Sequence, residues 1–426
     1  MRKKNLKKII KIGIVLVTLA LFCSCSKTPA IGNGDKPEIA EDNFKPSTLE
    51  NIDKELEAYE KYKKNAENAF VDMTPTAADE FEYTVTESGV RIDKHIGSSE
   101  MVIIPTHIDG IDVTEIAPEA FYMPDGKSII RSVYVPDTVR RVGFASFKEC
   151  SSLQLIRLPF IGDGGDNTHF GYVFGANKYD QNALNIPTSL EMIVIGEGED
   201  IVAERAFYGL KSVEAIVLMG TISIGKFAFY ECDQLCYISL PNTLKSIEDY
   251  AFSSCSALSK IDLPESVSSV GFGAFYRCKT MSDMTLSVIG DGKENTHIGY
   301  IFGAKTADWN ENFVPTSLRR VTLLDTCTRI ENKAFANCKS IVEINFSDKL
   351  EFIGIRSFVN CRSLAKIDCP TSLKIISGDA FFGCNNIVSL TVAGATKIEA
   401  QAFYGCNKLT NKSISTAATV AENAFE

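Results

Sequence analysis

The sequence has few of the residues and motifs that catalysis and metal binding require. It holds four histidines and one tryptophan in 426 residues, and it has no C-x-x-C, H-E-x-x-H or G-x-S-x-G sequence. Gly220–Lys226 has the G-x-x-x-x-G-K spacing of a phosphate loop, but Phe227 follows it where Ser or Thr must hold magnesium. We therefore predict no catalytic residue, no metal site and no cofactor.

Positive charge is also scarce. There are 44 Lys and Arg residues against 54 Asp and Glu residues, which gives a net charge of −10. Residues 1–25 hold six basic residues and no acidic ones, so the chain without them carries −16. Such an acidic chain is a poor partner for nucleic acid and for anionic membranes. Beyond residue 25 there is no long apolar run, so we expect membrane attachment only through the N-terminus.

The N-terminal region divides into three parts. Residues 1–25 have a basic start, a short apolar run and a Ser24-Cys25 step that resembles the bacterial lipobox, which predicts a lipoprotein signal peptide with lipidation at Cys25. Residues 26–46 are rich in Pro and Gly and predict a flexible tether. Residues 47–72 predict a spacer helix that partly covers the exposed edge of the first coil. A partner-binding segment is the alternative interpretation of this helix.

Phenylalanine, usually preceded by alanine, recurs at a fixed interval. Within two runs the steps are 22 or 23 residues, at Phe207, Phe229, Phe252 and Phe275, then at Phe335, Phe358, Phe381, Phe403 and Phe425. A period of this length is typical of a solenoid. Leu258–Leu263 has the L-x-x-L-x-L signature of a leucine-rich repeat strand, which Pro264 ends because it lacks an amide donor. We predict a leucine-rich repeat solenoid over residues 79–425, with a parallel β ribbon of about twelve coils.

Two coils carry a duplicated insertion. Residues 161–176 (IGDGGDNTHFGYVFGA) match residues 289–304 (IGDGKENTHIGYIFGA) at an offset of 128. We place the insertions at about 160–187 and 288–315, as protruding loops on one face of the solenoid. Their Asp, Asn and His residues could ligate calcium, but the spacing matches no known calcium loop. Asp and Asn that form turns are the favoured interpretation.

Thirteen cysteines in an exported chain raise the question of disulfides. Eight of them stand three residues after a repeat phenylalanine, at Cys150, Cys232, Cys255, Cys278, Cys338, Cys361, Cys384 and Cys406. Stacked coils would place these side chains in parallel about 4.8 Å apart, beyond the usual Cβ separation of a disulfide. We predict a ladder of buried free thiols.

Residues between the inward leucines of each strand should point outward along the concave ribbon. In the early coils these positions form a strip that is largely apolar, and contiguous exposed apolar patches usually mark interaction sites. The predicted ligand-binding residues are Tyr134, Leu155, Arg157, Met192, Val194, Ala215, Val217 and Tyr237. The alternative is that the inserted loop 160–186 folds down and covers this strip.

The pattern resembles the BspA-like bacterial leucine-rich repeat family over about residues 81–425. The entry segment Phe81–Ile92, followed by Val102–Pro105, Ile108–Ile116 and Ala120-Phe121, is similar to that family's first coils. The resemblance implies a lipid-anchored protein of the bacterial cell surface, and some members are adhesins for host matrix proteins such as fibronectin or fibrinogen. We expect a monomer that binds a protein partner, and proteins of the host extracellular matrix are one class of partner that the resemblance implies. An accessory lipoprotein docking an envelope protein of the same cell and a glycan-binding protein remain alternatives.

Overall fold

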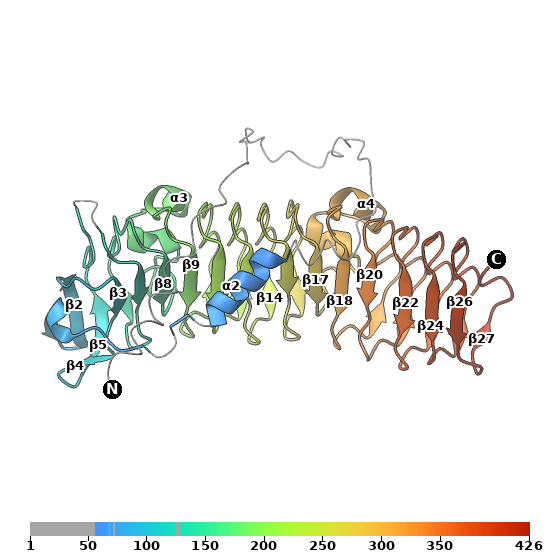
Figure 1. Cartoon of the computed structure of the whole chain (residues 1–426), viewed down its shortest axis with the longest axis horizontal. Helices are drawn as coiled ribbons and strands as arrows, with labels where there is room; N and C mark the ends of the chain where they lie inside the picture. The colour runs from blue at the N-terminus through green and yellow to red at the C-terminus, as the bar shows by residue number, and fades with distance from the viewer. Residues whose placement is uncertain (1–55, 68, 71–72, 125–127) are drawn as a thin grey trace, which may run out of the picture. The chain divides into compact units, whose positions relative to one another are not determined.

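The computed structural model of the protein describes residues 56–67, 69–70, 73–124 and 128–426. The predicted signal peptide, the tether and residues 47–55 of the predicted helix lie outside these residues. All described residues belong to one compact unit, Asn43–Glu426. Figure 1 shows the strands of this unit following one another in chain order. No helix within the described residues is long and apolar enough to cross a membrane.

Short parallel strands form a ribbon along one side of the coils. They are β3 (Met101–Ile103), β6 (Ser132–Tyr134), β8 (Leu155–Leu158), β9 (Met192–Ile195), β11 (Ala215–Leu218), β13 (Tyr237–Ser239), β15 (Lys260–Asp262), β17 (Asp283–Leu286), β18 (Arg320–Leu323), β20 (Glu343–Asn345), β22 (Lys366–Cys369), β24 (Ser389–Val392) and β26 (Asn411–Ile414). Ala215 pairs with Tyr237 of the next coil, 22 residues later, and Leu155 pairs with Met192 of the next coil although an insertion lies between them. The parallel ribbon predicted from the repeat is confirmed.

Two-residue strands form a second row of parallel pairs. They are β7 (Arg141–Val142), β10 (Ile201–Val202), β12 (Ser223–Ile224), β14 (Ser246–Ile247), β16 (Ser269–Val270), β19 (Arg329–Ile330), β21 (Phe352–Ile353), β23 (Ile375–Ile376), β25 (Lys397–Ile398) and β27 (Thr419–Val420). The second residue of each is apolar, and it is buried in all of them except β27. Where both rows are paired, backbone hydrogen bonds connect neighbouring coils on two sides. The second row is interrupted at each insertion, because β7 does not pair with β10 and β16 does not pair with β19.

The N-terminal end is closed by a small mixed sheet. A short 3₁₀ turn, η2 (Ala78–Glu80), leads into β1 (Phe81–Thr86), which pairs antiparallel with β2 (Gly89–His95). β2 then pairs in parallel with β5 (Ile111–Ile116), and β4 (His107–Ile108) pairs antiparallel with β5. β2 and β3 precede the twelve coils predicted from the sequence, so the stack has about fourteen coils. The β1–β2 hairpin, and not a helix, covers the first coil.

A column of phenylalanine rings runs through the core. The ring of Phe252 stacks on Phe229 with centroids 4.8 Å apart, and on Phe275 with centroids 5.4 Å apart. The planes differ by only 2° and 4°. A second column runs from Phe335 to Phe425 with separations of 5.0–5.2 Å. The fixed period of the sequence thus places equivalent rings in contact on successive coils.

The insertions continue this core before they protrude. The first contains η3 (Phe170–Phe174), η4 (Tyr179–Gln181) and α3 (Asn182–Asn185), and the second contains η5 (Ile298–Phe302), η6 (Ala307–Trp309) and α4 (Asn310–Phe313). Phe174 and Phe302 are buried and lie 6.3 Å and 6.4 Å from the preceding rings of the column. Gly175 and Gly303 end η3 and η5 with φ of 93° and 97°, a conformation that glycine adopts without strain.

The cysteine ladder is buried and free, as predicted. All eleven cysteines in the described residues are buried and form no disulfide. The ladder thiols also donate hydrogen bonds. Cys255 Sγ lies 3.1 Å from the carbonyl oxygen of Phe229, and Cys278 Sγ lies 3.1 Å from that of Phe252. Because the acceptor belongs to the preceding coil and already accepts the backbone amide of that coil's own cysteine, each of these thiols adds a second hydrogen bond that links neighbouring coils.

We expect the ladder thiols to resist alkylation in the folded protein. Burial raises the pKa of Cys278 and of Cys150 to about 12, so almost no thiolate is present at neutral pH. Iodoacetamide labelling read by mass spectrometry should modify them only after denaturation. Ladder cysteines found oxidised in pairs would contradict the assignment.

Candidate binding surface beneath the N-terminal helix

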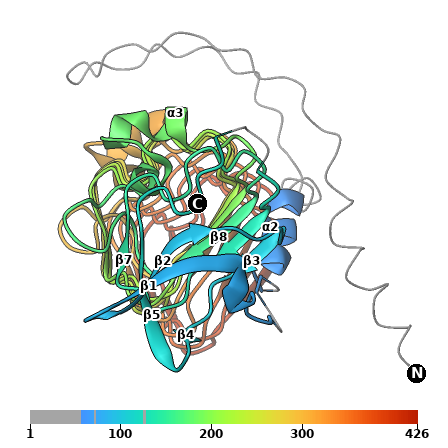
Figure 2. The same ribbon diagram turned by 90° about the vertical axis from the view of Figure 1, so that its left-hand side faces the viewer.

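The strip predicted to be exposed lies beneath a helix. α2 (Glu57–Glu67) contacts strands β11 and β13 of the ribbon. Figure 1 shows α2 crossing the ribbon, and Figure 2 shows it against the ribbon side, away from α3. Its first turn carries Glu57 and Glu60 and its last turn carries Lys64, charges that favour the helix dipole.

Two tyrosines of α2 pack into the outward side chains of the ribbon. Tyr59 and Tyr62 are buried, and they form one cluster with Met192, Ala215, Cys236 and Tyr237. The rings of Tyr59 and Tyr237 meet edge to face with centroids 5.1 Å apart. Leu155, Val217 and Ala66 lie at the edge of this cluster. The cluster is separate from the main core of the coils, so it holds the helix to the ribbon and not the coils to one another.

Polar groups on β15 hold the hydroxyl of Tyr59. This hydroxyl donates a hydrogen bond of 2.7 Å to Asp262 Oδ2. Lys260 Nζ lies 4.9 Å from the centre of the Tyr59 ring and 3.3 Å from the same Asp262 oxygen. Burial, together with the Asp262 carboxylate, raises the pKa of Tyr59 far above its usual value, so the phenol remains a neutral donor.

Acidic residues surround Tyr62. Burial raises the pKa of the Tyr62 phenol, and the nearby Glu214 and Glu191 raise it further. Burial also raises the pKa of Glu191, with the charge of Glu214 as the next cause, while Lys61 of α2 acts in the opposite direction. The surface that α2 covers is therefore apolar in the middle and acidic at its margin.

The chain after α2 covers the earlier strands. The ring of Phe70 lies 5.3 Å from that of Tyr134 on β6. The guanidinium of Arg157 stacks on Tyr134 at 4.7 Å, and its Nη2 pairs with Asp137 at 2.5 Å. Arg157 is itself buried, with Nη1 donating to the Val135 carbonyl. The contacts made by Tyr59 through Phe70 thus extend from β15 back to β6.

The repeated coils match one known protein family. The BspA type leucine rich repeat region matches residues 114–163, 178–295 and 310–426, in six copies. The chain belongs to this family. Among curated proteins none matches the sequence.

Several solved structures are similar to this BspA-type chain. A leucine-rich repeat protein from Bacteroides ovatus is 22% identical, with 82% of this chain and 99% of that chain covered and a TM-score of 0.36. A leucine rich cell surface protein from Faecalibacterium prausnitzii is also 22% identical, with coverages of 82% and 96% and a TM-score of 0.34. The leucine rich repeat protein of T. pallidum is 23% identical, with coverages of 68% and 91% and a TM-score of 0.22.

Three expectations about this surface of the BspA-type chain are wrong. The strip does not face water, because Met192, Val194, Ala215 and Tyr237 are buried. The inserted loop does not cover it either. The cover is α2, which was expected at the edge of the first coil and lies instead across the middle of the ribbon. Whether these side chains bind a ligand stays a prediction.

The later coils of the BspA-type ribbon present charged side chains that pair with one another. Arg320 bridges two coils, with Nη1 3.0 Å from Asp283 Oδ2 and Nε 2.9 Å from Glu343 Oε2. Thr285 donates a hydrogen bond of 2.6 Å to Asp262. The outward side chains of this half of the ribbon are thus polar, and the charged ones named here form ion pairs with neighbouring side chains.

The polar residues of the insertions have structural partners. Asp163 Oδ1 accepts the amides of Gly165 and Asn167 at 2.8 Å and 3.1 Å. These hydrogen bonds lower the pKa of Asp163 although burial acts in the opposite direction. Asn182, fully buried, accepts the amide of Gly171 at 3.1 Å and lies 3.3 Å from His169 Nδ1. The turn-forming interpretation is confirmed, and the described residues contain no group of three His, Cys, Asp or Glu that could hold a metal.

Proposed function

We propose that this BspA-type protein is exported, anchored by lipid at the bacterial cell surface, and binds a protein partner through the ribbon strip that α2 covers. The observation that supports the proposal most directly is the cluster of Tyr59 and Tyr62 with ribbon side chains. An amphipathic helix already lies on this strip in the free chain. Helix recognition by an apolar surface is a recurring mode of protein binding, so a partner helix would displace α2.

The strip determines what kind of partner would fit. Its centre accepts aromatic and apolar side chains, because Tyr237 and Met192 pack against tyrosine rings. Its margin is acidic, with Glu191, Glu214 and Asp262 close to the helix. We therefore expect a helix with an aromatic stripe and lysine or arginine beside it, as in α2. Large side chains at the centre of such an interface usually carry most of the binding energy.

Lipid anchoring depends on Cys25, which lies outside the described residues. Replacing Cys25 with Ala should move the protein from the detergent phase to the aqueous phase in phase separation, because the thiol that receives the lipid is lost. Cys23→Ala is the matched control and should leave partitioning unchanged. Partitioning of the Cys25 variant like the parent would exclude lipidation at this residue.

Two sources of partner can be separated by one experiment. The protein is immobilised and exposed in parallel to host matrix extract and to an envelope extract of the cell that makes it. A host adhesin should retain matrix protein and little envelope protein. The reverse result would favour an accessory lipoprotein of the same cell. Neither role requires chemistry, and BspA-type repeats serve as interaction scaffolds, so we propose no catalytic activity.

A further inference from the structure

The two insertions differ at one buried position although their surroundings are duplicated. At the offset of 128, β17 corresponds to β8 and β19 corresponds to β10, so residues of the two copies can be compared one by one. Ile161 and Ile289 are equivalent in this comparison. Glu199 of the first copy is replaced by Cys327 in the second.

In the first copy a carboxylate fills the space between these segments. Glu199 Oε2 accepts a hydrogen bond of 2.6 Å from the amide of Ile161. Burial raises the pKa of Glu199, and the amides of Ile161 and Ile201 oppose this rise by donating to the carboxylate. A charged group that accepts backbone amides in a half-buried position forms hydrogen bonds stronger than neutral ones.

In the second copy this carboxylate is absent and a cavity remains. The cavity measures about 230 Å³ and is lined by both Cys327 and Ile289. Cys327 Sγ lies 3.6 Å from the Leu286 carbonyl oxygen. The amide of Ile289, whose equivalent binds Glu199, has no acceptor within the described residues. The second copy therefore keeps the backbone amide but lacks the carboxylate that accepts its hydrogen bond in the first copy.

Positive charge has been added around the cavity. Lys293 stands where the first copy has Gly165, and Arg329 stands where it has Ile201. Arg329 Nε pairs with Glu331 Oε1 at 2.8 Å, which leaves Lys293 as the excess charge of the lining. This excess is positive in a chain whose net charge is −10.

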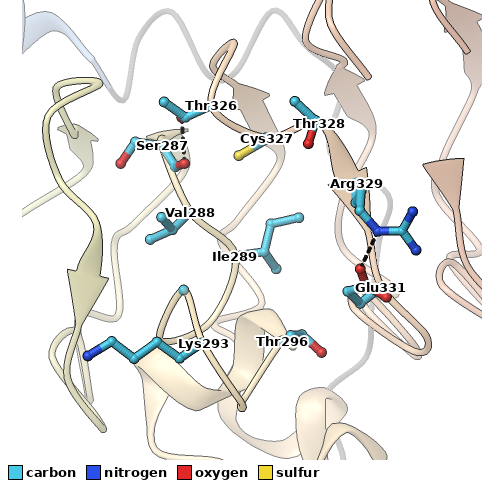
Figure 3. A pocket seen from close by; sticks show the side chains of 11 residues that line it. Ser287, Val288, Ile289, Lys293, Thr296, Thr326, Cys327, Thr328, Arg329 and Glu331 are labelled. Atoms are coloured by element: carbon cyan, nitrogen blue, oxygen red, sulfur yellow. Dashed lines mark hydrogen bonds and ion pairs between the residues drawn. The ribbon is translucent and has the colours of Figure 1, made fainter. Parts of the chain in front are cut away.

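Hydroxyl groups complete the lining. Figure 3 shows Thr326 and Thr328 on one side of Val288 and Ile289, and Lys293 and Thr296 on the other. The Thr326 hydroxyl donates a hydrogen bond of 2.6 Å to the Ser287 carbonyl oxygen, so Thr296 and Thr328 supply the hydroxyls that can donate to a carboxylate. The lining therefore combines an amide donor, the hydroxyls of Thr296 and Thr328, and the exposed side chain of Lys293, whose ammonium group must turn toward the cavity to reach an anion.

We propose that the second insertion binds a carboxylate, which takes the place that the Glu199 side chain fills in the first insertion. The cavity is below the usual size of a drug-like ligand site, so it suits a small organic acid or one acidic side chain of a partner. The site lies in the second insertion, apart from the cluster beneath α2, and does not depend on the proposed function of that strip.

The test is a ligand-observed NMR titration of the full chain with succinate, at constant ionic strength. We expect a dissociation constant of the order of 1 mM, as suits a ligand of this size. Cys327→Glu, which restores the carboxylate of the first copy, should abolish binding. Lys293→Gly, the residue of the first copy, should weaken binding about fivefold. Lys305→Asn removes the same charge from the same insertion outside the cavity and should leave binding unchanged.

Two further probes identify the source of the carboxylate. A capped glutamate peptide that binds as well as succinate supports an acidic side chain of a protein. Binding of succinate alone supports a free organic acid. Binding by neither probe, binding of a capped glutamine peptide as strong as that of the glutamate peptide, or binding unaffected by Cys327→Glu would overturn the proposal.

Discussion

Replacing Phe252 with alanine is expected to lower the free energy of unfolding by about 3–5 kcal/mol. The ring is fully buried and stacked on both sides, by Phe229 and Phe275. Each coil packs only on its neighbours, so no other part of the chain can fill the space that the ring leaves. The loss should appear in thermal and urea denaturation followed by circular dichroism.

An exposed aromatic gives the matched control for this change. Tyr404 stacks on Phe382 with centroids 5.0 Å apart but keeps 42% of its surface exposed. Tyr404→Ala should cost about 1 kcal/mol or less, because it removes one aromatic contact and leaves no cavity. Equal losses at the two positions would show that the stacked column is not what stabilises the coils.

The double change Tyr59→Asp with Tyr62→Asp should release α2 from the ribbon. An aspartate at position 59 would face Asp262, and one at position 62 would face Glu191 and Glu214. Cys236 lies in the cluster beneath the helix, and burial raises its pKa to about 12. Once the helix is released, we expect alkylation of Cys236 to accelerate about tenfold or more while the ladder thiols stay protected.

The outward face of the same helix provides the control. Ala58 and Asn65 are exposed, so Ala58→Asp with Asn65→Asp adds the same charges without entering the cluster. This variant should label Cys236 at the parent rate. Rapid Cys236 labelling in the parent protein would mean that α2 does not cover the strip, and faster labelling of the ladder thiols would mean that the aspartates unfold coils.

The repeat explains why most of the fold could be predicted from the sequence. In a solenoid the same contacts recur at each step, so the spacing of Phe229, Phe252 and Phe275 specifies which rings meet. The thiol ladder follows from the same register. Its hydrogen bonds to phenylalanine carbonyls could not be predicted, because they depend on the path of the backbone between coils.

The position of α2 could not be derived in this way. Leu56, Tyr59 and Tyr62 predict a helix with one apolar face, but periodicity does not say where that face packs. The ribbon carries its own signal, since an apolar strip on Met192 and Ala215 needs a cover. The sequence does not show that the helix covers the strip, because the two segments lie more than a hundred residues apart and belong to no shared repeat. The cavity near Cys327 could not be predicted from the sequence either. The duplicated sequence shows that Cys327 replaces Glu199, but only the structure shows that a cavity lies beside it.

The most direct test of the proposed function compares capture of protein by three forms of the chain, from host matrix extract and, in parallel, from envelope extract of the cell that makes it. These are the parent, the Tyr59→Asp with Tyr62→Asp variant, and that variant with Val217→Asp added at the edge of the strip. If a partner binds the strip in place of α2, the released form should retain about tenfold more protein than the parent. The added aspartate should abolish this gain. Equal capture by all three forms would contradict the account.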